Sequence, residues 1–269
     1  MTSRQHVLSL LAVLLMAAPG LAAPTHSGTW TASVKETQLQ LSLRMKGEQG
    51  WQIGMPVPLT AFQGLSTADG STAPFRMTRE AGTFAFEGRF SGGEGAGHYQ
   101  FEPSESYAKA MAGLGYPKLS PDDHFKLALF DITTTRIKEL GALGYKDIPL
   151  EDLFEVGIFQ VTPEFIRALA SAGYTKLSLK ELVQCRIHGV TPEFIREIRG
   201  MGFSSISQED LLAFRIHGVT PAFIREIRDM GYPSVTADDL VKLRIHGIDS
   251  DFMRSFSGGK GGGDARKKP

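Results

Sequence analysis

The chain has 269 residues, of which 42% are hydrophobic and 22% are charged, and its 29 basic residues balance its 29 acidic residues. This composition excludes a disordered chain, a collagen-like chain and a strongly basic nucleic-acid-binding protein. The single cysteine excludes an internal disulfide framework and a four-cysteine zinc site. The length is too great for one small domain and suits two.

The N-terminus has the three parts of a secretory signal. Arg4 supplies the basic start, residues 7–18 form a short apolar run, and small residues follow up to Ala23. We expect cleavage after Ala22, which makes residues 1–22 a signal peptide. The apolar run is shorter than the roughly 20 residues that cross a bilayer. The sequence therefore predicts an exported protein, periplasmic or extracellular, with no membrane span in the mature chain.

Residues 28–103 show the two-residue period that is typical of β-strands. Leu39, Leu41 and Leu43 alternate with polar neighbours, and the aromatic residues of the later part alternate in the same way. Residues 92–97 contain four glycines and predict a hairpin turn. We expect an antiparallel β domain of five or six short strands.

Residues 104–256 contain a repeat of 29 residues. Its clearest column consists of glycines that are each followed by an aromatic residue: Gly115, Gly144, Gly173, Gly202 and Gly231. Each unit predicts two short helices. The first helix starts at a capping residue such as Ser178 and ends at a glycine such as Gly189, and the second starts at a Thr-Pro pair. Residues 104–114 predict a helix equivalent to the second helix of a unit.

Helices of about ten residues are not stable alone, so consecutive units must pack on one another. The predicted fold class is α+β: a small N-terminal antiparallel β domain followed by an α-helical hairpin-repeat solenoid of about five units. Residues 257–269 are rich in glycine and lysine and predict a disordered tail.

Equivalent side chains of the repeats are the candidate binding residues. They form three columns: Arg167, Arg196 and Arg225; Arg186, Arg215 and Arg244; and His188, His217 and His246. A row of arginines suits an anionic partner, whereas pairing with glutamates of the same repeats would make the row an ordinary solvated face. The histidines precede helix-ending glycines, where the helix dipole favours a cationic ring. Packed helices lie about 10 Å apart, too far for these histidines to share one metal ion.

The charge of the repeats argues against a nucleic-acid partner, because residues 116–260 hold 18 basic and 20 acidic residues. Cys185 falls in an apolar column and predicts a core residue. We find no catalytic motif, and the sequence predicts no catalytic residue, metal site or cofactor.

The segment 182–202 (Leu-Val-Gln-Cys-Arg-Ile-His-Gly-Val-Thr-Pro and onward) resembles repeats of uncharacterised exported bacterial proteins. It is also similar to extracytoplasmic extensions of some sensor peptidases of the β-lactamase-regulator type. The stretches 82–88 and 97–103 resemble the domain that often precedes those repeats. The peptidase motif is absent, since none of the seven histidines is followed by glutamate, so no catalytic residue is carried over. The resemblance implies a bacterial envelope protein in sensing or regulation.

Together these observations favour a non-enzymatic interaction module that binds a protein or an envelope polymer through its repeat surface. One alternative is an envelope hydrolase with its site in the β domain or at the domain junction, for which His98, Glu87 and Glu102 are the nearest candidates. Another alternative is a structural component of the envelope.

Overall fold

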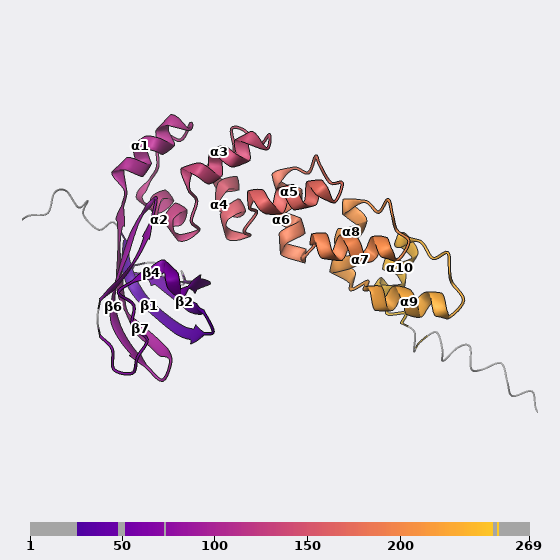
Figure 1. Cartoon of the computed structure of the whole chain (residues 1–269), viewed down its shortest axis with the longest axis horizontal. Coiled ribbons are helices and arrows are strands. Elements are labelled where there is room, and N and C mark those ends of the chain that lie inside the picture. The colour runs from indigo at the N-terminus through magenta and orange to yellow at the C-terminus, as the bar shows by residue number, and fades with distance from the viewer. Residues whose placement is uncertain (1–25, 48–51, 73, 250–251, 253–269) are drawn as a thin grey trace, which may run out of the picture. The chain divides into compact units, whose positions relative to one another are not determined.

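The structure is a computed structural model that describes residues 26–47, 52–72, 74–249 and 252. Its fold is α+β: a curled, seven-stranded antiparallel sheet precedes ten α-helices within this part of the chain (Figure 1). The predicted signal peptide, residues 1–22, and the predicted tail, residues 257–269, lie outside the described residues.

The chain divides into two compact domains. The first runs to Ala112 and also includes Pro117–Ala128, and the second comprises Gly113–Tyr116 and the chain from Leu129 onward. The first domain thus holds the sheet and all but the last residue of each of the first two helices. Among the helices that the structure describes, none is long and apolar enough to cross a membrane.

The sheet has the strand order β3-β2-β1-β7-β6-β5-β4, and every neighbouring pair is antiparallel. The strands are β1 His26–Lys35, β2 Gln38–Met45, β3 Gln52–Pro58, β4 Phe62–Gln63, β5 Phe75–Arg79, β6 Gly82–Ser91 and β7 Glu94–Pro103. The expected count of five or six strands is therefore too low. β4 has only two residues, and a strand of that length shows no alternation in the sequence.

One face of the sheet is packed with aromatic rings. The buried aromatic residues of the strands are Trp30, Phe62, Phe75, Phe84, Phe86, Phe90, Tyr99 and Phe101. Phe125 of α2 lies over this face, with its ring centroid 5.4 Å from those of Phe84 and Phe101. The alternation predicted for β2 is confirmed, because its three leucines at positions 39, 41 and 43 are fully buried. Aromatic pairs of this kind each contribute about 0.5–1.5 kcal/mol beyond the area that they bury.

The hairpin between β6 and β7 is tighter than the sequence predicted. Only Gly92 and Gly93 form the turn, with φ angles of 59° and 79°, the positive values that a two-residue type I′ turn requires. Gly95 and Gly97 belong to β7, where an added Cβ atom would overlap atoms of β6. These two glycines serve close strand packing and not the turn.

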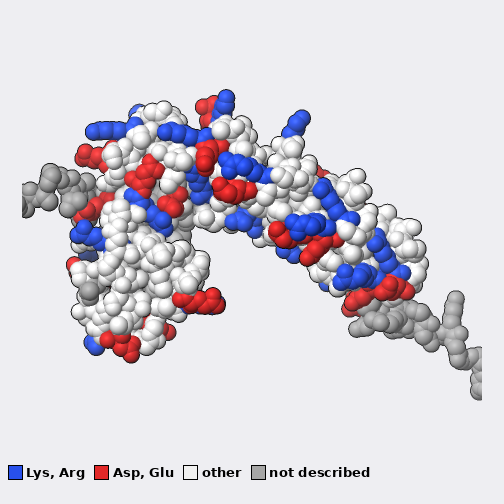
Figure 2. Space-filling model, viewed as in Figure 1, with Lys and Arg blue, Asp and Glu red and all other residues white. Residues whose placement is uncertain are grey.

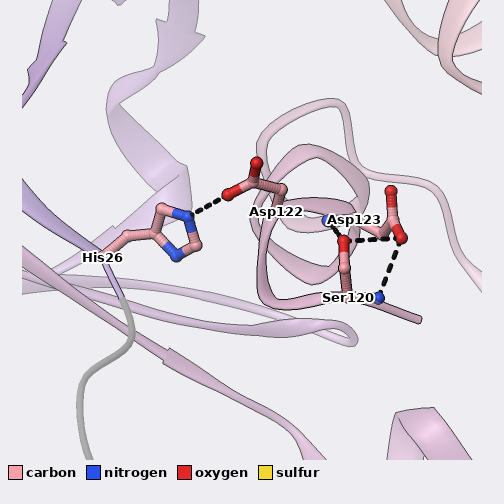
Figure 3. A network of polar contacts seen from close by, with 4 residues as sticks. All are labelled: His26, Ser120, Asp122 and Asp123. Atoms are coloured by element: carbon pink, nitrogen blue, oxygen red, sulfur yellow. Dashed lines mark hydrogen bonds and ion pairs between the residues drawn. The ribbon is translucent and has the colours of Figure 1, made fainter. Parts of the chain in front are cut away.

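A histidine connects the first strand to α2, which spans Pro121–Leu129. Nε2 of His26 in β1 lies 2.6 Å from Oδ1 of Asp122 in the first turn of α2 (Figure 3). The buried His26 ring also stacks on Phe125, with 4.9 Å between the centroids. The Asp123 N–H donates to the Ser120 hydroxyl oxygen, while the Ser120 N–H donates to the Asp123 carboxylate. The Asp123 carboxylate therefore takes part in the N-terminal cap of α2, while the neighbouring Asp122 carboxylate binds His26 of β1.

The helices follow the predicted repeat register. The first helices of the units are α2, α4 Leu150–Ile158, α6 Leu179–His188, α8 Gln208–His217 and α10 Ala237–Ile245, and the second helices are α1 Glu105–Gly113, α3 Thr134–Ala142, α5 Pro163–Ser171, α7 Pro192–Gly200 and α9 Pro221–Asp229. Within each series, successive helices start exactly one repeat length apart. The helix expected at 104–114 is confirmed as α1, one repeat length before α3.

The predicted capping residues start and end these helices. In α3, α5, α7 and α9 a threonine oxygen accepts the N–H of the third following residue. Ser178 and Glu181 form a complete capping box at α6, whereas Ser207 of α8 accepts the Asp210 N–H without the reciprocal backbone bond. Gly189 ends α6 with a φ of 70°, in the left-handed region that favours glycine.

The close packing at Gly88 gives a direct test of the sheet. A Cβ atom at Gly88 would lie 2.6 Å from the Trp30 ring and would overlap the Ala96 carbonyl. We expect G88A to lower the free energy of unfolding by about 1–3 kcal/mol, the usual cost of overpacking. Urea denaturation followed by tryptophan fluorescence measures this loss. The matched control is G54A in β3, where a Cβ atom meets nothing within 4 Å; equal losses in both variants would contradict the prediction.

His124 of α2 predicts a dependence of stability on pH. Burial lowers its pKa, and a hydrogen bond to the Ala81 backbone offsets only part of this effect. The unfolded ring takes up a proton near its ordinary pKa of about 6.5, while the folded ring does so only at lower pH. The stability that the neutral His124 ring contributes is therefore fully present above that pH and is lost as the pH falls below it. Melting temperatures between about pH 7.5 and pH 5.5 should fall less steeply in H124Q, and an unchanged slope would contradict the prediction.

Candidate interaction surface

The column Arg186, Arg215 and Arg244 connects successive units. Each guanidinium lies over a phenylalanine ring of the preceding second helix. The distances to the ring centroids are 4.8 Å for Arg186 over Phe165, 4.4 Å for Arg215 over Phe194 and 4.7 Å for Arg244 over Phe223. Nε of Arg186 donates to the Phe159 carbonyl at 3.0 Å, and Nε of Arg215 donates to the Gly189 carbonyl at 2.8 Å. These candidate binding residues therefore have a structural role, which we call the arginine brace.

Tyrosine hydroxyls form a second set of bonds between units, at positions that the sequence analysis did not single out as functional. Each donates to a backbone carbonyl that lies slightly more than one repeat length later in the chain. The bonds are Tyr116 to Ile148 at 2.6 Å, Tyr145 to Leu177 at 2.7 Å and Tyr174 to Ile206 at 2.7 Å. Their signal in the sequence is the aromatic residue after each repeat glycine. The next residue in this aromatic column is Phe203, which has no hydroxyl and cannot form the bond. The aromatic ring is therefore kept at a position where the hydrogen bond is lost.

Three further arginines, which the sequence pattern did not indicate, also lie between helices. Arg199 stacks on Tyr174 with 5.3 Å to the ring centroid, and Arg228 stacks on Phe203 with 5.4 Å. Arg136 donates through Nη2 to two carbonyls of the next unit, at residues 156 and 161, at 3.0 and 3.1 Å. Burial lowers the pKa of Arg136. Arg199 and Arg228 have non-arginine counterparts in earlier units, so periodicity alone gave little sign of their role.

The column Arg167, Arg196 and Arg225 faces solvent on the second helices α5, α7 and α9. Arg167 lies 3.4 Å from Glu164, and Arg196 lies 4.0 Å from Glu193, each one helical turn away. At Arg225 the corresponding acidic residue is replaced by Ala222. Exposed ion pairs of this type contribute little to stability, so the fold leaves these guanidinium groups accessible to a partner.

The histidine column is also exposed. His188 and His217 are the last residues of α6 and α8, and His246 follows the end of α10. The predicted glycine ends are present, with φ angles of 70° at Gly189 and Gly218. Across the described residues, no group of three His, Cys, Asp or Glu side chains is arranged to hold a metal ion.

The residues considered for a hydrolase lie on the outer face of the sheet. Glu87 of β6 and His98 of β7 are cross-strand partners and both are exposed, while Glu102 pairs with Thr83 farther along the same strands. His98 borders a surface hollow of about 520 Å³ together with Arg44 and Lys46. The sheet register thus brings Glu87 and His98 together and places Glu102 apart from them.

Several groups with altered pKa values occupy structural positions. Burial raises the pKa of Tyr99, in the sheet core, to about 12. Burial also raises the pKa of the Cys185 thiol, whose sulfur accepts a hydrogen bond from Gln208 at 3.6 Å. Hydrogen bonds from Ser178 lower the pKa of the Glu181 carboxyl in the capping box. Cys185 is a buried core residue, as predicted.

The structure also exposes four isoleucines at equivalent positions, which the sequence analysis missed. They are Ile158, Ile187, Ile216 and Ile245. Their regular spacing, at one equivalent position in each unit, was visible in the sequence. Their exposure was not, because an apolar column is usually part of a core.

Comparison of the chain with models of protein families gives no match, and comparison with curated proteins gives no match.

The arginine brace can be tested at Arg215. The change R215K removes the planar group that stacks on Phe194 and the Nε–H that binds Gly189, and a lysine reproduces neither contact. We expect a loss of about 1–2 kcal/mol in the free energy of unfolding of the helical units. Urea denaturation followed by far-UV circular dichroism measures it. The matched control is R196K, at an exposed arginine whose ion pair lies within its own helix, and it should change stability by less than about 0.5 kcal/mol; equal effects would contradict the role of the brace.

Proposed function

We propose that this protein is an exported, non-enzymatic interaction module that binds a protein or an envelope polymer through the exposed columns of its helical units. The observation that carries the proposal is a division among the repeated side chains. Arg186, Arg215 and Arg244 recur because they connect the units. The exposed Arg196 and His188 recur as well, and binding a partner explains their repetition.

In this proposal the helical units stack as a solenoid. Contacts between α4 and α6, between α6 and α8, and between α8 and α10 support it, as do contacts between α3 and α5. The arginine brace and the tyrosine hydroxyl bonds join the same successive units. A stack of this kind repeats each exposed side chain at regular intervals and thus offers an extended surface for recognition.

The partner binds through local contacts and not through a broad electrostatic field. On the face seen in Figure 2, basic and acidic side chains are intermixed over the helices. The exposed positive groups recur singly, one in each unit, as in the column Arg167, Arg196 and Arg225. Such an arrangement favours a partner with discrete acidic groups over a uniformly charged polyanion such as a nucleic acid.

The signal peptide predicted at residues 1–22 supports a location in the periplasm or outside the cell. The resemblance to extensions of exported sensor proteins supports a bacterial source and a role in sensing or regulation at the envelope.

Affinity capture tests the proposed surface. The full chain, immobilised and exposed to bacterial envelope extract, should retain a partner that mass spectrometry identifies. Charge reversal in R196E/R225E should weaken binding of this partner about tenfold, equivalent to a loss of about 1.4 kcal/mol, and should leave the melting temperature nearly unchanged because both side chains are exposed.

The control variant is K176E/K180E, which changes the net charge equally at exposed positions outside the three columns. Equal weakening by both double variants would show a general charge effect and would contradict the proposed surface. Failure to retain any specific partner would contradict the proposed function itself.

A further inference from the structure

Four isoleucines in the last turns of α4, α6, α8 and α10 leave about half of their surface exposed. Their exposed fractions are 46% for Ile158, 50% for Ile187, 54% for Ile216 and 56% for Ile245. Single exposed aliphatic residues are ordinary in soluble proteins. Here four of them occupy the same position in four successive first helices, and we call this set the isoleucine row.

The fold does not require isoleucine at these positions. A solvated helix position favours lysine, glutamate or glutamine, because β-branched side chains lose rotamer freedom in a helix. Another exposed position of the same helices does vary in residue type from unit to unit: it holds Glu151, Lys180, Glu209 and Asp238. The isoleucine is retained in all four units while that position varies in charge. This contrast points to contact with a partner.

The spacing of the row fits a helix. The helices that carry the row, α4, α6, α8 and α10, contact one another in succession, and the axes of packed helices lie about 8–10 Å apart. An α-helix returns to the same face after seven residues, a rise of about 10.5 Å. Side chains on one face of a β-strand recur at about 6.6 Å and about 13 Å, which matches the row poorly.

The charges beside the row define the polarity of the partner. In three units the isoleucine lies between an arginine and a histidine. The seven residues that end at the glycine after this histidine contain no acidic side chain in any of the three units: 183–189, 212–218 and 241–247. The arginine brace holds the arginines in place through the stacking on phenylalanine. On this protein, fixed guanidinium groups lie beside an aliphatic side chain. The complementary pattern on a partner is an aliphatic side chain flanked by carboxylates.

We propose that the isoleucine row binds an acidic amphipathic helix of a partner protein. The helix carries an aliphatic residue at every seventh position and carboxylates beside it, so its apolar face covers the isoleucines and its acidic groups meet the arginines. This inference rests on the proposed function, because it names the class of partner that the same helical units bind.

Designed peptides test the inference directly. A synthetic helical peptide of about 21 residues, or three heptads, carries leucine at every seventh position and glutamate beside each leucine; a second peptide has lysine in place of each glutamate. Fluorescence anisotropy measures the binding of each to the full chain. The acidic peptide should bind, and the lysine peptide should bind at least tenfold more weakly. In I187S/I216S the acidic peptide should lose at least tenfold in affinity.

The matched control is Y232S, which removes a residue that is 51% exposed on the same helical units but outside the row. It should leave the affinity for the acidic peptide unchanged. The inference is overturned if the acidic peptide fails to bind, if it binds I187S/I216S as tightly as the unchanged protein, or if an acidic proline-rich peptide of equal charge binds more tightly than the helical one.

The two proposals fail in different ways. If capture from envelope extract is lost in R196E/R225E and is unchanged in I187S/I216S, the isoleucine row is not the binding surface and the proposed function stands. If the unchanged protein retains no partner from the extract, the proposed function fails whatever the designed peptides show.

Discussion

A nine-residue helix leaves the last four of its carbonyl groups without a partner inside the helix, and such a short helix is not stable in water alone. Most of the helices that the structure describes have that length. Side chains of other units donate to carbonyls at their ends and in their connecting loops: the Arg215 Nε–H to Gly189 and the Tyr145 hydroxyl to Leu177 are examples. Because donor and acceptor belong to different units, each helix depends on its neighbours. The repeated side chains that remain exposed are then the ones that need another explanation.

The sheet solves a different packing problem, since it must bring many aromatic rings onto one face. Glycine at residues 88, 95 and 97 removes the side chains that would separate neighbouring strands at this core. The two edges of the sheet are short or interrupted: β4 has two residues, and β3 carries Pro56 and Pro58, which lack an N–H to offer another strand. The ring of Phe125 in α2 then adds to the aromatic core, and His26 bonds the start of the sheet to the same helix. Residue types that usually indicate turns thus determine the shape of the sheet.

The helical units combine a structural and an exposed set of side chains on the same short segments. In the sequence Arg186-Ile187-His188 all three side chains are exposed, and the arginine also stacks on Phe165 and donates to a carbonyl of the preceding unit. The brace therefore fixes the position of a positive group directly beside an exposed aliphatic side chain. Repetition of this tripeptide in three units gives a regular pattern of apolar and basic groups, and this pattern supports recognition of a partner helix with the complementary pattern.

The sequence alone determined the helical register, because glycine, proline and the capping residues act through the local backbone. It predicted the repeat spacing of the helices and the capping box at Ser178, whereas at Ser207 the predicted box lacks its reciprocal backbone bond. It did not separate Arg186 from Arg196, since both recur at the repeat spacing and differ only in whether an aromatic ring of another unit lies beneath the guanidinium. It also gave no sign that Ile187 is exposed. Local chemistry decides where each helix starts and ends, while the role of each repeated side chain depends on contacts with residues of other units, far away in the chain, and only the tertiary structure shows those contacts.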